Sequence, residues 1–220
     1  MRHFDELLEQ LRNKLLQMSA LVESSIIDSV KSLTERNSSE AEAVLKRESE
    51  INQLEITIDD ISTSLLALEQ PVANDLRFIT VAAKINSNLE RIGDLAVNIA
   101  ERSESLIQHP QFRVRADIPR LADLATSMVQ QSLDAFVKKD TDEARGVLLS
   151  DNAVDDLRDS IYNELIGYMK KNPQAVQPCV DLMFAARSLE RIADHATNIA
   201  EGVIFMIEGI DVRHHAQAGR

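Results

Sequence analysis

The sequence predicts an all-α protein built as a tandem repeat of two three-helix bundles, with six long helices. Three observations lead to this fold class. Glycine (6), proline (5) and aromatic residues (4%) are scarce among the 220 residues, which disfavours a β-sandwich or barrel. Apolar residues recur at steps of three and four, as along the buried face of a packed helix. A segment with one polar face also occurs twice, 100 residues apart.

The first half contains three predicted helices, each with its own apolar stripe. A break and a helix N-cap are expected at residues 37–39. Pro71 and Asn74 mark a second turn, where Asn74 or Asp75 is expected to cap the third helix. Residues 109–110 end that helix. The stripes are formed by Phe4, Leu8, Leu11, Leu15, Met18 and Val22, then by Val44, Ile51, Leu54, Ile58, Ile61, Leu65 and Leu68, and then by Ile85, Leu89, Ile92, Ala96, Ile99 and Leu106.

The second half repeats this plan with three more predicted helices. Pro119 lies near the start of the fourth helix, since proline is tolerated in a first turn. The sequence "KKNPQAVQP" (170–178) separates the fifth helix from the sixth. Their stripes are formed by Val147, Val154, Leu157, Ile161 and Tyr168, and by Leu189, Ile192, Ala196, Ile199 and Val203.

An internal duplication is visible in two places. The segment "NLERIGDLAVNIAE" (88–101) matches "SLERIADHATNIAE" (188–201) at ten of fourteen positions. The segment "EAEAVL" (40–45) matches "EARGVL" (143–148) at an offset of 103 residues. Two copies of one helical unit are therefore expected. We place the first at residues 1–112 and the second at 113–220.

The charge balance excludes several classes of partner. The chain has 24 basic and 36 acidic residues, a net charge of −12, so nucleic acid and anionic membrane surfaces are expected to repel it. The single cysteine, Cys179, rules out an internal disulfide framework and fits a reducing compartment. No signal peptide or apolar run long enough to span a membrane is present. We expect a cytoplasmic protein without direct membrane insertion.

Acidic residues gather on one face of the third predicted helix. Glu90, Asp94, Asn98 and Glu101 are spaced so that they share a face, about opposite the apolar stripe if each residue turns the helix by about 100°. We therefore expect these side chains to point outward. The sixth predicted helix repeats this face with the residues Glu190, Asp194, Asn198 and Glu201.

The preceding helices each add another pair of acids. Glu55 and Asp59 lie four residues apart on the second predicted helix, and Asp155 and Asp159 do so on the fifth. Helices joined by a short loop are usually antiparallel neighbours, so four carboxylates can meet in each half. Such clusters favour hard cations, namely Mg²⁺, Ca²⁺, Mn²⁺ or iron.

The residues beside the acids leave alternatives open. His195 matches Leu95 in the other half, so it is either a surface histidine or a metal ligand of the second half alone. Arg91 and Arg191 either neutralise the acids or tie neighbouring helices together. Gly93 matches Ala193, so this position requires a small residue for the close approach of a helix or a cation.

Three classes of function are compatible with such a bundle. The first is a metal-binding regulatory adaptor. The second is a carboxylate-bridged di-metal oxidase or a ferritin-like metal-storage protein, which requires Glu-x-x-His pairs facing the core. Here Glu90 is followed three residues later by Gly93, and Glu190 by Ala193. The third is an interaction protein without metal. No catalytic grouping is visible, so we expect that the protein is not an enzyme.

Certain motifs resemble those of a known family. The segment "QPVANDLR" (70–77), followed by "NLERIGD" (88–94) and later by "ARSLERIAD" (186–194), is similar to the PhoU family. The resemblance covers essentially the whole chain. It implies a cytoplasmic protein of two three-helix bundles that represses the phosphate-starvation response. It also implies that the protein links the ATPase subunit of a phosphate ABC transporter to a sensor histidine kinase. A homodimer is the default expectation.

The resemblance further implies multinuclear clusters of iron or zinc, bound by pairs of E/D-x-x-x-D motifs. One site would use Glu55, Asp59, Glu90 and Asp94. The other would use Asp155, Asp159, Glu190 and Asp194. Asn98, Glu101, Asn198 and Glu201 are candidates for further ligands, and manganese or magnesium remain possible occupants.

The second site departs from the first. At the offset of 103 residues, Glu55 aligns with Arg158 and Asp59 with Tyr162, so the second pair of acids is displaced by about one turn. We expect that site to be built differently or to bind metal more weakly. Asp75 and Arg77, within "NDLR", are expected either to cap the third helix or to bind a partner.

Overall fold

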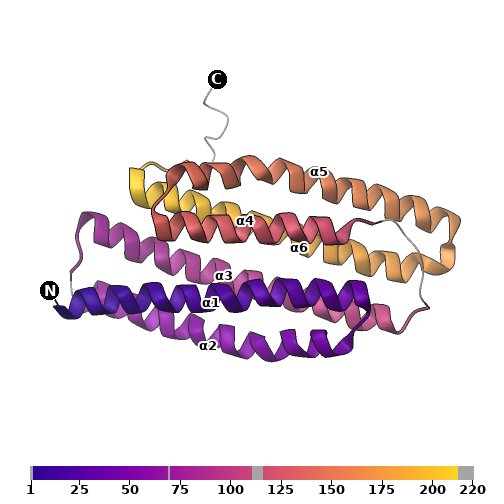
Figure 1. Cartoon of the computed structure of the whole chain (residues 1–220), viewed down its shortest axis with the longest axis horizontal. Coiled ribbons are helices and arrows are strands. Elements are labelled where there is room, and N and C mark those ends of the chain that lie inside the picture. The colour runs from indigo at the N-terminus through magenta and orange to yellow at the C-terminus, as the bar shows by residue number, and fades with distance from the viewer. Residues whose placement is uncertain (1, 69, 111–115, 213–220) are drawn as a thin grey trace, which may run out of the picture.

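A computed structural model of the chain describes residues 2–68, 70–110 and 116–212. Within these ranges the chain is helical and contains no strand, which confirms the all-α prediction (Figure 1). The elements are α1 (Arg2–Glu35), α2 (Ser38–Leu68), α3 (Ala73–Ile107), α4 (Ile118–Lys138), α5 (Thr141–Lys171), the short 3₁₀ turn η1 (Pro173–Ala175) and α6 (Val176–Glu208). No helix in the described ranges is both long and apolar enough to cross a membrane.

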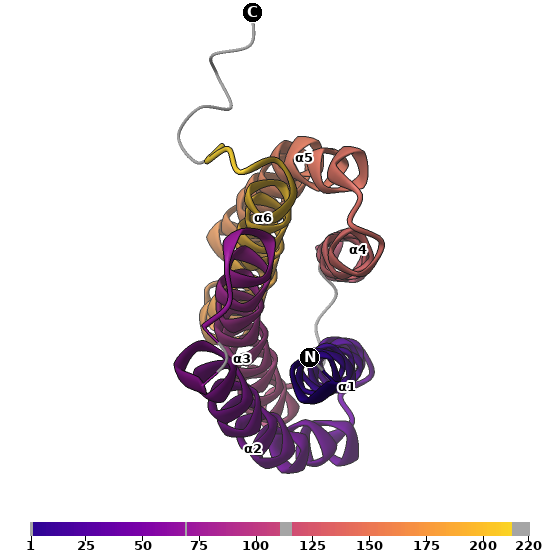
Figure 2. The same cartoon turned by 90° about the vertical axis from the view of Figure 1, so that its left-hand side faces the viewer.

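The helices form two bundles of three, as the sequence predicts. Helices α1, α2 and α3 all pack against one another, and so do α4, α5 and α6. The two bundles meet where α3 packs along α6 and α1 contacts α4. In Figure 2, α2, α3, α6 and α5 form a curved layer, with α1 and α4 on its inner side. The predicted boundary between residues 112 and 113 lies outside the described residues and stays a prediction.

The predicted apolar stripes form a common core. Most of their members are fully buried, from Leu11 and Leu15 on α1 to Ile199 and Val203 on α6. The stripe residues Phe4, Leu8, Ile61, Leu157 and Tyr168 are only partly buried but pack against this core. Leu68, the last residue of α2, was wrongly included in its stripe, because it lies at the helix end and is 75% exposed. A continuous core across both bundles explains why the halves lie side by side rather than as separate units.

Small residues let neighbouring helices approach closely. A Cβ atom added to Gly93 would lie 3.3 Å from Ile51 Cδ1, so the side chain of Ile51 on α2 packs directly against the backbone of α3 at this point. Close packing of the helices, rather than a cation, therefore accounts for the small residue predicted at position 93. A Cβ atom on Gly202 would lie 3.3 Å from Val81 Cγ1 and marks a similar approach of α6 to α3.

The predicted cap of α3 and the predicted start of α6 are both wrong. The N-cap of α3 is Val72, with no side-chain capping bond among the described residues, so neither Asn74 nor Asp75 caps this helix. Instead, Asn74 Oδ1 accepts a hydrogen bond of 2.5 Å from Arg77. Arg77 Nε donates a hydrogen bond of 3.2 Å to the carbonyl oxygen of Met206, so Arg77 caps a backbone carbonyl group in the last turn of α6. Helix α6 begins earlier than predicted, because Pro178 fits within its first turn.

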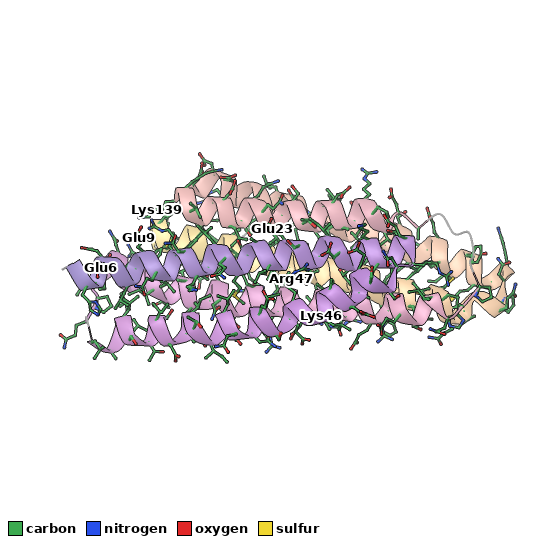
Figure 3. The ribbon with its side chains drawn as sticks, turned by 60° about the horizontal axis from the view of Figure 1, so that its bottom comes forward. Glu6, Glu9, Glu23, Lys46, Arg47 and Lys139 are labelled. Atoms are coloured by element: carbon green, nitrogen blue, oxygen red, sulfur yellow. The ribbon has the colours of Figure 1, made fainter. Side chains whose placement is uncertain are left out.

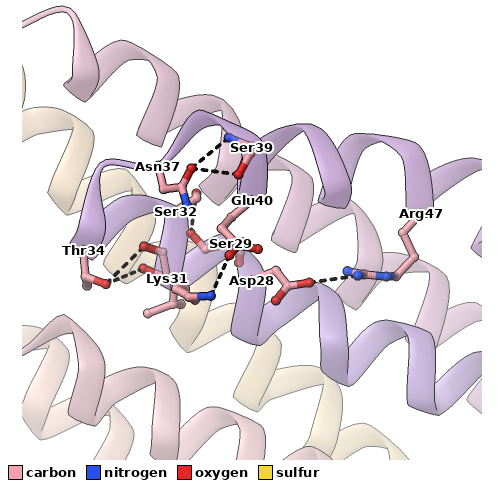
Figure 4. A network of polar contacts seen from close by, with 10 residues as sticks. Asp28, Ser29, Lys31, Ser32, Thr34, Asn37, Ser39, Glu40 and Arg47 are labelled. Atoms are coloured by element: carbon pink, nitrogen blue, oxygen red, sulfur yellow. Dashed lines mark hydrogen bonds and ion pairs between the residues drawn. The ribbon is translucent and has the colours of Figure 1, made fainter.

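Polar contacts fix the hairpin between α1 and α2 (Figure 4). Asn37 Oδ1 accepts a hydrogen bond of 3.1 Å from the backbone N–H of Ser39, which confirms the predicted cap. Behind this turn, Arg47 pairs with Asp28 at 2.8 Å, and Lys31 pairs with Glu40 at 2.6 Å. These pairs hold α2 antiparallel to α1 and thereby set the orientation of the acidic face of α2.

The hairpin between α4 and α5 carries a testable cap. Asp140 Oδ1 accepts hydrogen bonds from the backbone N–H groups of Asp142 (2.9 Å) and Glu143 (3.0 Å). We expect Asp140→Ala to lower the free energy of unfolding by about 1 kcal/mol, because two backbone donors lose their acceptor. Asp140→Asn keeps the acceptor and is the matched control. Urea denaturation of both variants checks this result, and equal losses for Ala and Asn would contradict it.

Candidate metal centre

The first acidic cluster lies between α2 and α3. Burial raises the pKa of Glu90, and the carboxylates of Asp94 and Glu55 raise it further, against the opposing effect of Arg91. The side chain of Glu90 is only 18% exposed, whereas that of Asp94 is 38% exposed. The predicted acids of α2 and α3 therefore act on one another electrostatically. Their mutual repulsion is the condition that a cation would relieve.

A buried amide supports this cluster and was not foreseen from the sequence. Asn86 Nδ2 donates to Asp59 Oδ1 at 2.9 Å and to the carbonyl oxygen of Glu55 at 3.0 Å. Asn86 Oδ1 is buried and has no hydrogen-bond partner among the described residues. The spacing Asn86-x-x-x-Glu90-x-x-x-Asp94 was the available signal, because it places the amide on the acidic face. Asn86 thus orients the carboxylate of Asp59.

Arg91 supplies the positive charge nearest to the first cluster. Its Nε lies 3.4 Å from Glu90 Oε2, and its terminal nitrogen lies 3.6 Å from Asp94 Oδ2. The arginine side chain is 60% exposed, so solvent weakens both interactions. Arg91 therefore offsets only part of the repulsion within the cluster.

The second cluster carries its own cation. Arg158 pairs with Asp155 at 2.9 Å, with Asp159 at 2.9 Å and with Glu190 at 2.5 Å. Its side chain is only 20% exposed. Arg158 occupies the position that Glu55 holds in the first half, so an acid of one cluster is replaced by a base in the other. The difference expected from the sequence alignment thus takes the form of an internal ion-pair network.

One further acid belongs to the second cluster. Asp194 is exposed as a residue, but partial desolvation of its carboxyl group against α5 raises its pKa from 3.8 to about 6, with further contributions from Glu190, Asp151 and Asp155. Burial and Asp155 likewise raise the pKa of Asp151. Sequence reasoning missed Asp151, although it continues the four-residue spacing of Asp155 and Asp159. Asp159 is 66% exposed and reaches the cluster through Arg158.

The outward direction predicted for the acids is only partly right. On α3 and α6, for which this direction was predicted, Glu101 and Asp194 are exposed, but the side chains of Glu90 and Glu190 are each 18% exposed. The spacing of residues along one helix takes no account of the helices that pack beside it. In the bundle, α2 covers the flank of α3, and Arg158 of α5 covers Glu190, which explains the difference.

The additional candidates lie elsewhere. Asn98, Asn198 and Glu201 line hollows between α3 and α6, and Glu101 is exposed. His195 is not the surface histidine that one alternative proposed, because it is half-buried and its Nδ1 lies 2.8 Å from Asn88 Oδ1. Arg191 is exposed, as is its counterpart Arg91, but unlike Arg91 it makes no ion pair or hydrogen bond among the described residues.

The donor chemistry fits a metal better in the first half than in the second. As the side chains stand, no three His, Cys, Asp or Glu residues in the described ranges are arranged to hold a metal ion. The first cluster nevertheless offers four carboxylates, and repulsion among them contributes to the raised pKa of Glu90. Such a set of oxygen ligands suits a hard cation. In the second cluster Arg158 already provides positive charge. Metal binding at both sites remains a prediction.

The raised pKa of Asp194 leads to a pH-dependent prediction. The folded protein holds this proton more tightly than the unfolded chain, so the fold loses stability as the pH rises from about 4 to 6. We expect Asp194→Asn to remove this penalty and to stabilise metal-free protein at pH 7.5, by less than about 1 kcal/mol because the side chain is exposed.

At pH 4 the variant should show no advantage over the wild-type chain. Thermal unfolding at both pH values measures this difference. Asp156→Asn, at an exposed acid on the same bundle, is the control and should behave alike at both pH values. A gain for Asp194→Asn that is equally large at pH 4 would contradict the assignment.

Comparison with known proteins shows clear similarity over nearly the whole chain. A model of the PhoU domain matches residues 15–103 and again residues 118–203. The chain is 39% identical over 214 residues to the phosphate-specific transport system accessory protein PhoU homolog of Pseudomonas aeruginosa, covering 97% of this chain and 88% of that protein. It is 33% identical over 211 residues to the phosphate-specific transport system accessory protein PhoU of Serratia marcescens, covering 96% and 87% of the two chains.

Solved structures agree with this result. The crystal structure of PhoU from Pseudomonas aeruginosa matches with a TM-score of 0.91 and 38% identity, over 94% of this chain and 100% of that one. The phosphate transport system regulatory protein PhoU from Streptococcus pneumoniae matches with a TM-score of 0.87 and 27% identity, over 95% and 99%. These relatives are named as accessory or regulatory proteins.

Proposed function

Because the chain belongs to the PhoU family, we propose that it is an accessory protein of a phosphate-specific transport system and represses the phosphate-starvation response. The observation that carries this proposal is the pair of PhoU domains, which together span most of the chain. In this proposal the protein acts in the cytoplasm. It contacts the ATPase subunit of the transporter and a sensor histidine kinase, and it forms a homodimer.

A protein of this kind would act by binding. Charged side chains of both signs lie along the described surface, among them Glu6, Glu9 and Glu23 on α1 and Lys46 and Arg47 on α2 (Figure 3). To change a kinase from mostly active to mostly inactive, the protein must bind one state more tightly by several kcal/mol. Such a difference requires an extended, specific interface, and the long, rigid helices offer one.

The first acidic cluster would hold the metal. Glu55, Asp59, Glu90 and Asp94 supply carboxylate oxygens, which suit iron, manganese, magnesium or zinc. A bound cation would offset the repulsion that raises the pKa of Glu90 and would fix α2 against α3. The second set, Asp155, Asp159, Glu190 and Asp194, would bind metal more weakly because Arg158 neutralises part of it.

A reporter for a phosphate-starvation promoter tests the proposed function. In a strain from which the gene is deleted, we expect the reporter to be expressed even in high phosphate. A plasmid copy of this chain should silence it. A reporter that stays off in the deletion strain at high phosphate would contradict the proposal. Complementation with Leu149→Ala, at an exposed leucine, serves as a control for expression and should silence the reporter as well.

A further inference from the structure

Two related pockets lie between α3 and α6, one on each side of the junction between the bundles. The basic pocket has a volume of about 280 Å³, and its walls include Asn98, Arg102, Phe184, Arg187, Ser188 and Arg191. The twin pocket has the same volume, and its walls include Lys84, Ser87, Asn88, Asn198, Gly202 and Phe205. Positions in the two pockets correspond at the offset of 100 residues, so the duplication produced both.

The two pockets have opposite electrostatic character. Arg187 replaces Ser87, and Arg102 stands where the other half has Gly202. The basic pocket is thus lined by three arginines, with no carboxylate among its described lining residues. The twin pocket contains Lys84 together with the carboxylates of Glu201 and Asp211. Three arginines around one small pocket are unusual in a chain of net charge −12. The packing of α3 against α6 does not depend on their charge.

Arg102 is held in place from behind. Asp181 is fully buried, and its Oδ1 lies 3.6 Å from a terminal nitrogen of Arg102. Ser105 Oγ donates to Asp181 Oδ2 at 2.9 Å and fixes this carboxylate. The Arg102 guanidinium also stacks on Phe184, 4.8 Å from the ring centroid, and remains 41% exposed. A charged donor is therefore positioned at the pocket wall before any ligand arrives.

The other two arginines lie between the basic pocket and the hollow of the second acidic cluster. Arg187 and Arg191 are exposed and make no ion pair or hydrogen bond among the described residues. Both also border the hollow of the second acidic cluster. In that hollow Asp159 and Glu190 are paired with Arg158, and Asp194 also lines it. Arg187 and Arg191 thus border both the acidic hollow and the pocket that they share with Arg102, and no ion pair of theirs among the described residues has to break for an anion to bind.

We propose that the basic pocket binds a small tetrahedral oxyanion of the phosphate class. The planar guanidinium group suits such an anion because it donates two parallel hydrogen bonds to neighbouring oxygens. Asn98 and Ser188 add neutral donors at the same wall. The volume of about 280 Å³ leaves room for a small free anion. This inference is independent of the proposed regulatory function.

Calorimetric titration of the full chain with inorganic phosphate tests the proposal. The protein is first freed of metal by chelation and dialysis, so that a bound cation cannot recruit the phosphate. We expect saturable binding of one phosphate per chain. Arg187→Gln should weaken this binding at least about tenfold, because a charge-assisted hydrogen-bond donor is lost. Arg187 makes no ion pair or hydrogen bond within the described part of the chain, so the variant should melt within a few degrees of the wild-type chain.

The twin pocket provides the matched control. Lys84→Gln removes one exposed positive charge from the same two helices and should leave phosphate affinity unchanged. Absence of saturable binding to the wild-type chain would overturn the proposal, as would equal weakening by both substitutions. Phenyl phosphate serves as a second probe for a phosphorylated side chain. Binding of phenyl phosphate without binding of inorganic phosphate would overturn the assignment to a free anion.

Discussion

Replacing Arg158 with Glu is expected to destabilise the metal-free protein by about 2–4 kcal/mol. The substitution removes a mostly buried guanidinium that pairs with three carboxylates, and it adds a further carboxylate beside them. For a chain of this size the melting temperature should fall by roughly 5–15 °C. The variant places a glutamate at the position that Glu55 holds in the first half and removes the internal cation, so Mn²⁺ should stabilise it more than it stabilises the wild-type chain.

Thermal unfolding with and without Mn²⁺ measures both effects. Arg145→Glu is the matched control, because Arg145 also pairs with a carboxylate, that of Glu208 at 2.8 Å, but is 48% exposed. That exposed pair should contribute less than about 1 kcal/mol. Equal losses of stability for the two variants would show that Arg158 has no special role in the second cluster.

Truncating Leu89 to Ala should cost about 2–5 kcal/mol of unfolding free energy. Leu89 is fully buried on α3, directly beside Glu90, so the substitution opens a cavity in the core beneath the first acidic cluster. Leu149→Ala removes the same atoms from a leucine that is 81% exposed and should change stability by less than about 0.5 kcal/mol. Chemical denaturation compares the two. A loss below 1 kcal/mol for Leu89→Ala would contradict the assignment of the core.

The fold could be predicted from the sequence because helical periodicity and the internal repeat agree. The stripe on α3, from Ile85 to Leu106, is buried as predicted, and so is the stripe on α6. The repeat at 88–101 and 188–201 also indicated that α3 and α6 would be equivalent elements. These signals are local or lie within one helix, so they do not depend on knowing which helices meet.

The site could be predicted only as far as the acids are concerned. Glu55 and Glu90 lie in one electrostatic cluster as expected. The role of Arg158 depends on the exact rotation of α5 against α6, which spacing along one helix does not determine. The same holds for Asp151 and for Asn86, which reach across a helix interface. The cap of α3 was predicted wrongly for a different reason. The side chain of Asn74 binds Arg77, which also binds the end of α6, so Asn74 is not available as a cap.

The two halves differ in the charged residues at their corresponding sites. The first half keeps an acidic cluster with only the exposed Arg91 beside it. The second half has Arg158 within its cluster, where the first half has Glu55. The neighbouring basic pocket is lined by Arg102 of the first half and by Arg187 and Arg191 of the second. In our proposals the first cluster binds a cation and the pocket between the halves binds an anion.

The central claim is that the two clusters differ in their affinity for a cation. The metal content of the purified chain tests this claim most directly. Elemental analysis would compare the wild-type chain with Glu90→Gln/Asp94→Asn and with Glu190→Gln/Asp194→Asn, each checked for helicity by circular dichroism. We expect the first double variant to lose most of the bound metal and the second to keep it. Equal metal loss from both variants, or loss only from the second, would contradict the account.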